Sequence, residues 1–206
     1  MVNDSRFYYG VGLLIILISF VVFALGFEKR KPRAREIVML VCMISFAVIG
    51  RVIFYMTPQV IITGIALGKK AGFLTGAMTA FVSNFFMGQG PWTPWQMVAF
   101  GLLGYIFGIA YSKRNVGSYI PKKQKNFICF MGMLATIVVY GVIMDTATVL
   151  MSTDSPSVQA FITAYTAGFI MNVIHGISTF IFLWFMLIPM LKKIDRVNIK
   201  YGMYVK

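Results

Sequence analysis

Charged residues are scarce in this sequence, and acidic residues are the scarcest of them. Only 12% of its 206 residues are charged while 59% are hydrophobic, and six Asp and Glu stand against 19 Lys and Arg. This excludes a water-soluble domain, because the apolar residues come in runs long enough for a bilayer. Histidine occurs once, as His175, and the two cysteines lie in apolar runs. A bis-histidine haem, a three-histidine metal site and a disulfide framework are therefore not expected.

Patterns of catalytic residues are also missing. The sequence has no Gly-rich phosphate loop and no GxSxG motif, and Asp145 has no second carboxylate with which to share acid and base work. The apolar segments carry no repeated ring of charges, so the sequence does not indicate a pore. We therefore expect no catalytic residue, no cofactor and no metal. An intramembrane hydrolase using a serine with His175 is the enzymatic alternative.

Seven apolar segments predict an all-α integral membrane protein whose helices alternate across the bilayer. They cover residues 7–27, 37–55, 58–67, 71–87, 95–111, 127–150 and 158–191. The third has only about ten residues, short of the ~20 that cross a hydrocarbon core, and the last is far longer than needed. Neither is expected to be a simple lipid-facing rod.

The basic residues predict the orientation. All except Arg6 and Arg51 fall in three linkers and the C-terminal tail: 28–36, 68–70, 112–126 and 192–206. Since basic loops stay in the cytoplasm, these segments and the C-terminus are expected inside and the N-terminus outside. The unusual stretch GQGPWTPWQ, residues 88–96, then faces the exterior.

Small residues recur at helical spacing in the middle of the chain. They are Gly64, Gly68, Gly72, Gly76 and Ala80, followed by Gly101, Gly104 and Gly108 in the next segment. Small side chains let helix backbones approach closely in a membrane, where packing holds helices together. The pattern predicts a compact bundle.

Three polar residues lie deep in separate apolar segments. At ~1.5 Å per residue, Arg51, Asp145 and His175 lie about 24, 30 and 26 Å from the nearest basic linker, in a core ~30 Å thick. All three are therefore expected near the outer surface, beneath Trp92 and Trp95. The other polar or aromatic residues expected beside them are Tyr55, Gln89, Gln96 and Asn172.

Each of these residues also has a purely structural interpretation. Arg51 and Asp145 would neutralise each other in an ion pair, the tryptophans would anchor the interface, and His175 would be a hydrogen-bonded core residue. Together, however, they predict an outward-facing pocket with aromatic faces, amides, one histidine and one carboxylate. Such a pocket suits a neutral or mixed-polarity organic ligand.

The stretch at residues 88–96 is expected to form a loop that closes over this ligand. Pro91 and Pro94 would fix its backbone, and Gly88 and Gly90 would act as hinges. Trp92, Trp95 and Gln96 would then present two aromatic faces and an amide to the pocket.

Three stretches carry a resemblance to a known family. FAVIGR ends the second segment, TPQVIITGIALGKKAGFLTGAMTAFVSNFF covers the third and fourth, and GQGPWTPWQM precedes GLLGYIFG. Together they resemble the substrate-binding S components of energy-coupling factor (ECF) transporters, the vitamin-uptake branch of the ABC systems. The resemblance covers residues 35–191. It implies a six-helix core within 35–206, preceded at 1–34 by an extra transmembrane helix and a basic cytoplasmic linker.

The resemblance also implies a location and partners. The chain would lie in a bacterial cell membrane as a multi-pass protein and bind a vitamin at its outer face. Energy would come from the transmembrane scaffold protein EcfT and two cytosolic ATPases, and no nucleic acid is involved. The scaffold docks on an Ala-x-x-x-Ala pair of the first core helix, whose nearest counterpart here is Met43 and Ala47.

The GPWTPWQ stretch is most like that of S components assigned to cobalamin, so the resemblance implies cobalamin or another corrinoid as the ligand. Riboflavin, a pyridoxine-like ring and a modified purine stay open, because they would also stack on tryptophan and S components of one fold serve unrelated vitamins. The alternative from another class is a membrane enzyme acting on a lipid or a quinone.

Overall fold

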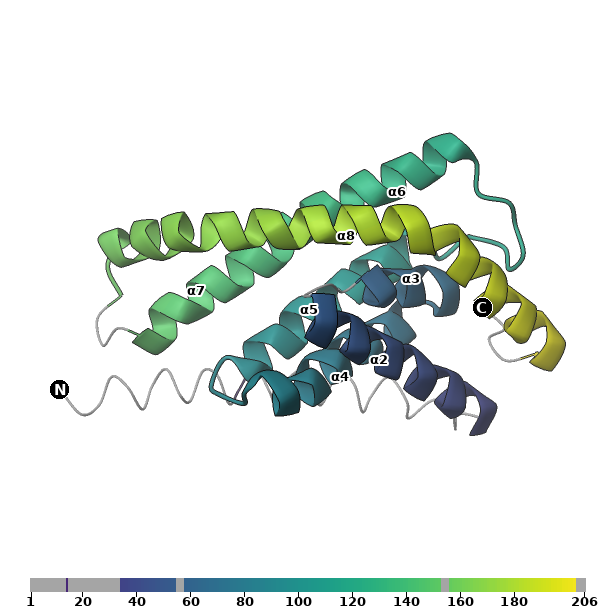
Figure 1. The fold of residues 1–206 in the computed structure, drawn as a ribbon, viewed down its shortest axis with the longest axis horizontal. Coiled ribbons are helices and arrows are strands. Elements are labelled where there is room, and N and C mark those ends of the chain that lie inside the picture. The colour runs from purple at the N-terminus through teal and green to yellow at the C-terminus, as the bar shows by residue number, and fades with distance from the viewer. Residues whose placement is uncertain (1–13, 15–33, 55–57, 153–155, 203–206) are drawn as a thin grey trace.

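The computed structural model describes Leu14 and residues 34–54, 58–152 and 156–202, and the regular elements in these ranges are helices (Figure 1). In chain order they are α2 (Ala34–Phe54), α3 (Pro58–Leu67), α4 (Lys69–Met87), α5 (Thr93–Ala110), α6 (Lys122–Ala135), η1 (Thr136–Tyr140), α7 (Gly141–Ser152) and α8 (Val158–Tyr201). The predicted all-α membrane class is confirmed. The predicted N-terminal helix at 7–27 and Tyr55 lie outside the described residues.

Within the described residues, four rods are long and apolar enough to cross a membrane: α2, α5, the continuous α6–η1–α7 and α8. With α3 and α4, they give six helical segments within the described residues, the number that the resemblance implies. Figure 1 shows α2 to α5 gathered on one side of the molecule and α6 to α8 on the other.

The short helix α3 is the centre of the bundle. All ten of its residues are buried, because α2, α4, α5 and α8 pack around it. A helix enclosed in this way does not need the length of a lipid-facing span. The prediction that this segment is no simple rod is confirmed.

The glycine ladder brings α3, α4 and α5 into backbone contact. A Cβ atom at Gly72 would lie 2.4 Å from the carbonyl oxygen of Gly104, and one at Gly104 would lie 2.2 Å from the carbonyl oxygen of Gly72. A Cβ atom at Gly64 would lie 2.2 Å from the Gly104 carbonyl as well. Only glycine allows the helices to approach this closely, so the predicted compact packing is present.

The last helix, α8, is 44 residues long and contains Pro189. At ~1.5 Å per residue it extends roughly 66 Å, about twice the thickness of a hydrocarbon core. Proline removes a backbone donor and bends a helix, and Figure 1 shows α8 turning near its yellow end. The prediction that the helix stops at residue 191 and continues as a tail is wrong. The basic segment stays helical to Tyr201 because its last turns pack against the linker after α5.

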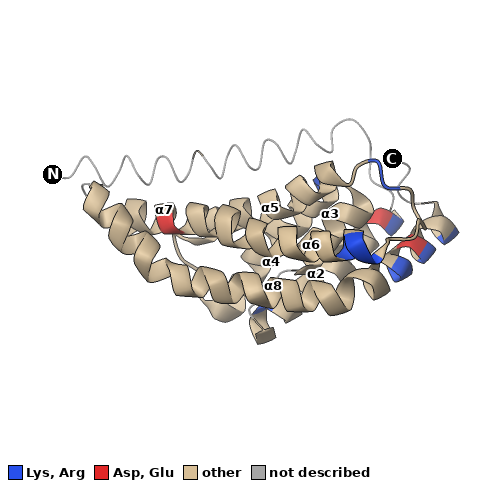
Figure 2. Cartoon of the chain, turned by 90° about the horizontal axis from the view of Figure 1, so that it is seen from above, with Lys and Arg blue, Asp and Glu red and all other residues tan. Residues whose placement is uncertain are grey.

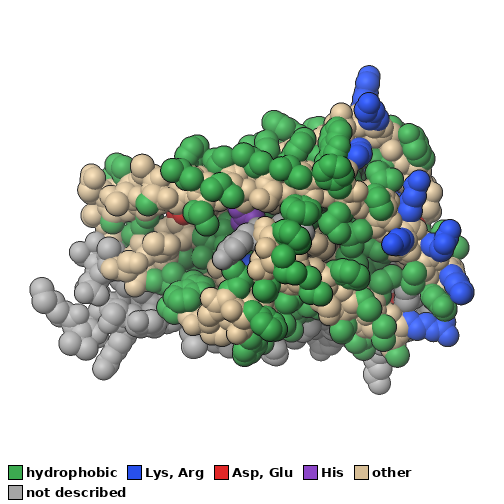
Figure 3. All heavy atoms as spheres, viewed as in Figure 1, with side chains coloured by type: hydrophobic (Ala, Val, Ile, Leu, Met, Phe, Trp, Pro, Cys, Tyr) green, Lys and Arg blue, Asp and Glu red, His purple; other side chains and the backbone are tan. Residues whose placement is uncertain are grey.

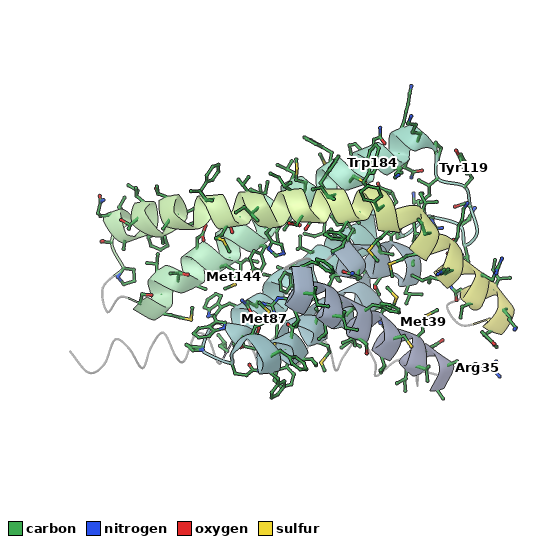
Figure 4. All side chains as sticks on the ribbon, viewed as in Figure 1. Arg35, Met39, Met87, Tyr119, Met144 and Trp184 are labelled. Carbon is green, nitrogen blue, oxygen red and sulfur yellow. The ribbon has the colours of Figure 1, made fainter. Side chains whose placement is uncertain are left out.

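Most of the charge lies at one end of the molecule, which we call the basic end. There α2, α4 and α6 begin and α3, α5 and α8 finish, so the linkers with Lys and Arg come together (Figure 2). Figure 4 shows Arg35 and Tyr119 at the basic end, and Met87 and Met144 toward the opposite end. We call this opposite end the polar-site end.

Replacing Gly72 by Ala tests the backbone contact. In an exposed helix, alanine would be more favourable than glycine by about 1 kcal/mol. Here we expect the opposite sign, a loss on the order of 1 to 3 kcal/mol in the free energy of unfolding, because the new Cβ overlaps the backbone of α5. Thermal unfolding of the purified protein in detergent measures it. Ala167→Leu on the exposed face of α8 is the control and should change little. A Gly72→Ala protein as stable as wild type would contradict the close packing.

Candidate ligand-binding site

Arg51 is the centre of a buried polar network at the polar-site end. Its side chain is 5% exposed, and its Nη1 donates to the Ser83 hydroxyl and to Asn84 Oδ1 at 2.8 Å. Its Nη2 donates to Gln96 Oε1 at 2.9 Å. One guanidinium from α2 therefore holds α4 and α5 at the same time. The fixed fork of arginine donors suits such a junction, which a lysine ammonium could not reproduce.

The network continues through the connection between α4 and α5. Asn84 Nδ2 donates to the Thr93 hydroxyl at 2.8 Å and to Gln96 Oε1 at 2.9 Å. The Thr93 hydroxyl donates to Gln89 Oε1 at 2.9 Å, and Gln89 Nε2 donates to the Phe81 carbonyl at 3.0 Å. Gln89 and Gln96, both predicted site residues, thus hold the connection in one conformation.

Three rings meet beneath Arg51. Phe100 of α5 is fully buried, and the guanidinium carbon of Arg51 lies 5.1 Å from the centre of its ring. Tyr140 stacks on Phe100 with ring centres 4.8 Å apart. His175 of α8 meets both rings edge-on, with centres 5.8 Å from Phe100 and 4.8 Å from Tyr140. This aromatic cluster joins the two sides of the bundle.

A π-helical turn positions Tyr140. The rod from Lys122 to Ser152 changes to π-helix over Thr136–Tyr140 before it continues as α7. A π-turn inserts one extra residue into the helix and re-aims the side chains that follow, and such turns are frequent at functional sites. Tyr140 is the last residue of this turn, and its hydroxyl faces Gln96 and Arg51.

Asp145 and Asn172 form a separate polar pair between α7 and α8. Asn172 Nδ2 donates to Asp145 Oδ2 at 2.8 Å, and both side chains are 8% exposed. Each of these two side chains faces a glycine on the other helix, where the missing Cβ atom leaves space for it. A Cβ at Gly168 would lie 2.2 Å from Asp145 Oδ1, and one at Gly141 would lie 2.8 Å from Asn172 Nδ2.

A histidine and a carboxylate are both visible on one face of the molecule at this end (Figure 3). In the space-filling view, purple histidine atoms lie inside a hollow between the α7–α8 side and the α2–α5 side, with red carboxylate atoms nearby (Figure 3). The surroundings are mainly green hydrophobic side chains. A concave, mainly apolar site with a few polar groups is the usual form of a small-molecule site.

The structure brings several of the predicted site residues together and separates others. Arg51, Gln96 and His175 meet around Phe100, whereas Asp145 pairs with Asn172. The predicted alternative of an Arg51–Asp145 ion pair is wrong. In the described residues Asp145 accepts from Asn172, and Arg51 donates to Ser83 and Asn84 of α4 and to Gln96 of α5.

The predicted closing loop at 88–96 is shorter than expected. Helix α5 begins at Thr93 with Pro94 in its first turn, so Trp95 and Gln96 are already helical. The non-helical part is residues 88–92. Gly88 has φ +106°, a conformation that side chains rarely adopt, which agrees with a sharp turn there. The loop ends early because proline suits the first helical turn, where its missing N–H costs nothing.

The two tryptophans differ in their surroundings. Trp92 is 40% exposed, and its ring covers Gly90, where a Cβ atom would lie 2.4 Å from the ring. Trp95 is half-buried in the first turn of α5. The aromatic face of Trp92 is therefore available at the surface of the polar-site end, both to a ligand and to the membrane interface.

Sequence reasoning missed several residues of the candidate site, four of which are central to it. Ser83 and Asn84 are the main partners of Arg51, and Phe100 and Tyr140 form the stacked pair. The polar pair Ser83–Asn84 inside an apolar segment could have indicated these partners, since a polar side chain within a membrane helix is costly unless it is paired. The two rings gave no signal, because aromatic residues are abundant throughout the chain.

Gln59 of α3 adds an unexpected polar group. It is 2% exposed and packs on Gly50, whose Cβ position lies 2.9 Å from Gln59 Nε2. Its Oε1 has no hydrogen-bond partner among the described residues. An unsatisfied amide oxygen near Gly50 is an available acceptor at this end of the bundle.

Met43 and Ala47, the expected scaffold-docking pair, lie inside the bundle. Met43 is 3% exposed and Ala47 is 0% exposed, and Met43 belongs to the main apolar core. They face inward because α2 packs this side onto α3 and α4. In this conformation they do not form an accessible docking surface. The exposed side of α2 instead carries Val38, Val41, Phe46 and Ile49.

The fold defines a polytopic helical membrane protein with a buried polar and aromatic cluster, the candidate site, at the end opposite its basic linkers. A family model described as "ECF-type riboflavin transporter, S component" matches residues 37–188. The chain therefore belongs to this family of ECF-type S components, the substrate-binding membrane subunits of these transporters. No curated protein and no solved structure matches the chain.

Replacing Arg51 tests whether its network holds α2 to α4 and α5. Arg51→Met keeps the apolar stem and removes every donor, so we expect it to lower the free energy of unfolding by at least about 1.5 kcal/mol. Arg51→Lys should fall between wild type and Arg51→Met, because an ammonium cannot span the same acceptors. Unfolding in detergent measures both. The matched control, Arg196→Met, changes an exposed arginine. Equal losses in Arg51→Met and Arg196→Met would show that the network contributes nothing.

Proposed function

We propose that the chain captures a flavin, with riboflavin as the first candidate, at the polar-site end and delivers it to an ATP-driven module. The observation that carries this is the meeting of Arg51 and Gln96 from one side of the bundle with Tyr140 and His175 from the other, around the ring of Phe100. The description of the matching family names riboflavin and supports the same ligand.

The chemistry of a flavin fits this group of residues. Its isoalloxazine ring is planar and aromatic, so it gains from contact with rings such as Trp92 and Tyr140. One edge of the ring is an imide with donors and acceptors side by side, which amides such as Gln59 and Gln96 can match. The ribityl hydroxyls need further polar partners, and Asp145 with Asn172 lies in the same hollow.

Cobalamin is the second candidate and is favoured by the GPWTPWQ stretch. A corrin has a broad apolar face fringed with amides, and three amide side chains, Asn84, Gln89 and Gln96, lie beside the two tryptophans. A histidine could also approach cobalt. His175, however, lies edge-on between Phe100 and Tyr140, an arrangement better suited to shaping a stacking site than to reaching a metal.

Family membership implies the partners. ECF-type S components bind the substrate, while a scaffold protein, EcfT, and two ATPases supply the energy. The chain itself is not an enzyme in this scheme.

Titration of the purified protein tests the ligand. Riboflavin fluorescence should be quenched at one site per chain, because flavin emission falls when the ring stacks on aromatic side chains. Trp92→Ala and Trp95→Ala should weaken binding on the order of 5- to 150-fold, or about 1 to 3 kcal/mol, in proteins that still fold. Trp184→Ala is the matched control, since Trp184 packs on Phe180 away from the site.

Cobalamin is titrated in parallel, and each outcome is informative. If the protein binds cobalamin but not riboflavin, the proposed ligand of this site becomes a corrinoid in place of a flavin. Binding of neither would contradict the proposed function. Affinities of both tryptophan variants within about twofold of wild type would reduce residues 88–92 to a simple turn and make the tryptophans interfacial anchors.

We further propose that the basic end is cytoplasmic and the polar-site end is outside, because basic linkers resist translocation. In a cysteine-free background made by Cys42→Ser and Cys129→Ser, one new cysteine is placed at each end. Gln159→Cys, at the exposed start of α8, should react with an impermeant maleimide added to intact cells. Lys123→Cys, exposed at the start of α6, should react only after the cells are opened. The reverse pattern would overturn the orientation.

A further inference from the structure

A cavity of about 580 Å³ lies at the basic end, far from the polar site. One wall is the linker after α5 and the other is the part of α8 around and beyond Pro189. Arg114 of the linker forms a two-bond ion pair with Asp195 of α8, with Nη1 and Oδ1 3.1 Å apart. The Cδ1 atom of Ile199 lies 3.4 Å from the Cβ position of Gly117. These contacts fix both walls.

The charge of the cavity is strongly positive. Its lining contains one carboxylate, Asp195, which is already engaged by Arg114. The other three charged residues are Lys192, Arg196 and Lys200, spaced four apart on α8. Residues four apart lie on the same face of a helix, so the three cations form one row along the cavity. The lining carries a net charge of +3.

Apart from Gly117 and Ser118, apolar and aromatic side chains form the rest of the lining. Ile188 and Leu191 come from α8 next to Pro189, and Ile120 comes from the linker. Ile199 and Tyr119 line the cavity as well, with exposures of 66% and 82%. Figure 4 shows Tyr119 on the linker, at the edge of the bundle. The cavity therefore joins an apolar surface at membrane depth to a row of cations at the membrane boundary.

We propose that this cavity binds an anionic phospholipid from the leaflet at the basic end. Lys192, Arg196 and Lys200 would hold the phosphate and the headgroup, and Ile188 and Leu191 would contact the first part of the acyl chains. Basic pockets between membrane helices on the cytoplasmic side are suited to anionic headgroups. A soluble anion would use the cations and leave the apolar wall uncovered, so a lipid matches more of the lining. The proposal is independent of which vitamin binds at the other end.

Native mass spectrometry with phosphatidylglycerol tests this proposal. The purified full chain is titrated with phosphatidylglycerol or phosphatidylcholine in detergent, and the population of 1:1 complexes gives the Kd. We expect the wild-type protein to bind phosphatidylglycerol at least about tenfold more tightly than phosphatidylcholine. The triple variant Lys192→Gln, Arg196→Gln, Lys200→Gln should lose this preference.

The matched control removes the same charge from the same end. Lys122→Gln, Lys123→Gln and Lys193→Gln are exposed positions that do not line the cavity, and this triple variant should keep the preference. Thermal unfolding and size-exclusion profiles verify that both variants fold. Equal losses in the two triple variants would show a general charge effect and overturn the site.

Competition with inorganic phosphate separates a lipid site from a site for soluble anions. We expect millimolar phosphate to leave phosphatidylglycerol bound, because it cannot replace the acyl contacts. Displacement by phosphate at concentrations similar to those of the lipid would overturn the lipid assignment. A wild-type protein that does not distinguish the two lipids would overturn it too.

Discussion

The buried guanidinium of Arg51 is the interaction on which the rest of the bundle depends. A charge inside a membrane protein is costly unless every donor is satisfied, and here the acceptors come from α4 and α5. Satisfying one side chain of α2 therefore fixes the positions of two other helices. The same acceptors, Asn84 and Gln96, hold the short connection between α4 and α5. The polar network thus determines where the turn with Trp92 lies.

The glycine ladder holds one part of the bundle together, and the aromatic cluster joins that part to the rest. Backbone contact through Gly72 and Gly104, and through Gly64, makes α3, α4 and α5 one tight unit. The other unit, α6 to α8, meets this unit at the polar-site end through Phe100, Tyr140 and His175. Rings can slide or separate more easily than interlocked backbones. A ligand is therefore best accommodated at this junction, where the hollow in Figure 3 lies.

Much of this arrangement was predictable because membranes restrict what a sequence can do. Apolar length predicted the helices, and clusters of Lys and Arg predicted one basic end. The helical rise placed Arg51, Asp145 and His175 toward the other end. The hydrogen-bond partners of Arg51 were not predictable. Its side chain could reach a carboxylate or several neutral acceptors, and the packing of the helices determines which of them lie within reach. The inward orientation of Met43 and Ala47 and the early start of α5 at Thr93 also depend on tertiary contacts.

The long helix α8 contributes side chains to both ends of the molecule. Asn172 and His175 lie at the polar-site end, and Lys192, Arg196 and Lys200 line the cationic cavity. From His175 to Lys192 the rise of ~1.5 Å per residue gives about 26 Å, close to the thickness of a hydrocarbon core. Pro189 lies near the second site, so its bend redirects only the part of the helix that leaves the membrane. A single helix therefore contributes an amide and an imidazole to the polar site at one end and a row of cations to the cavity at the other.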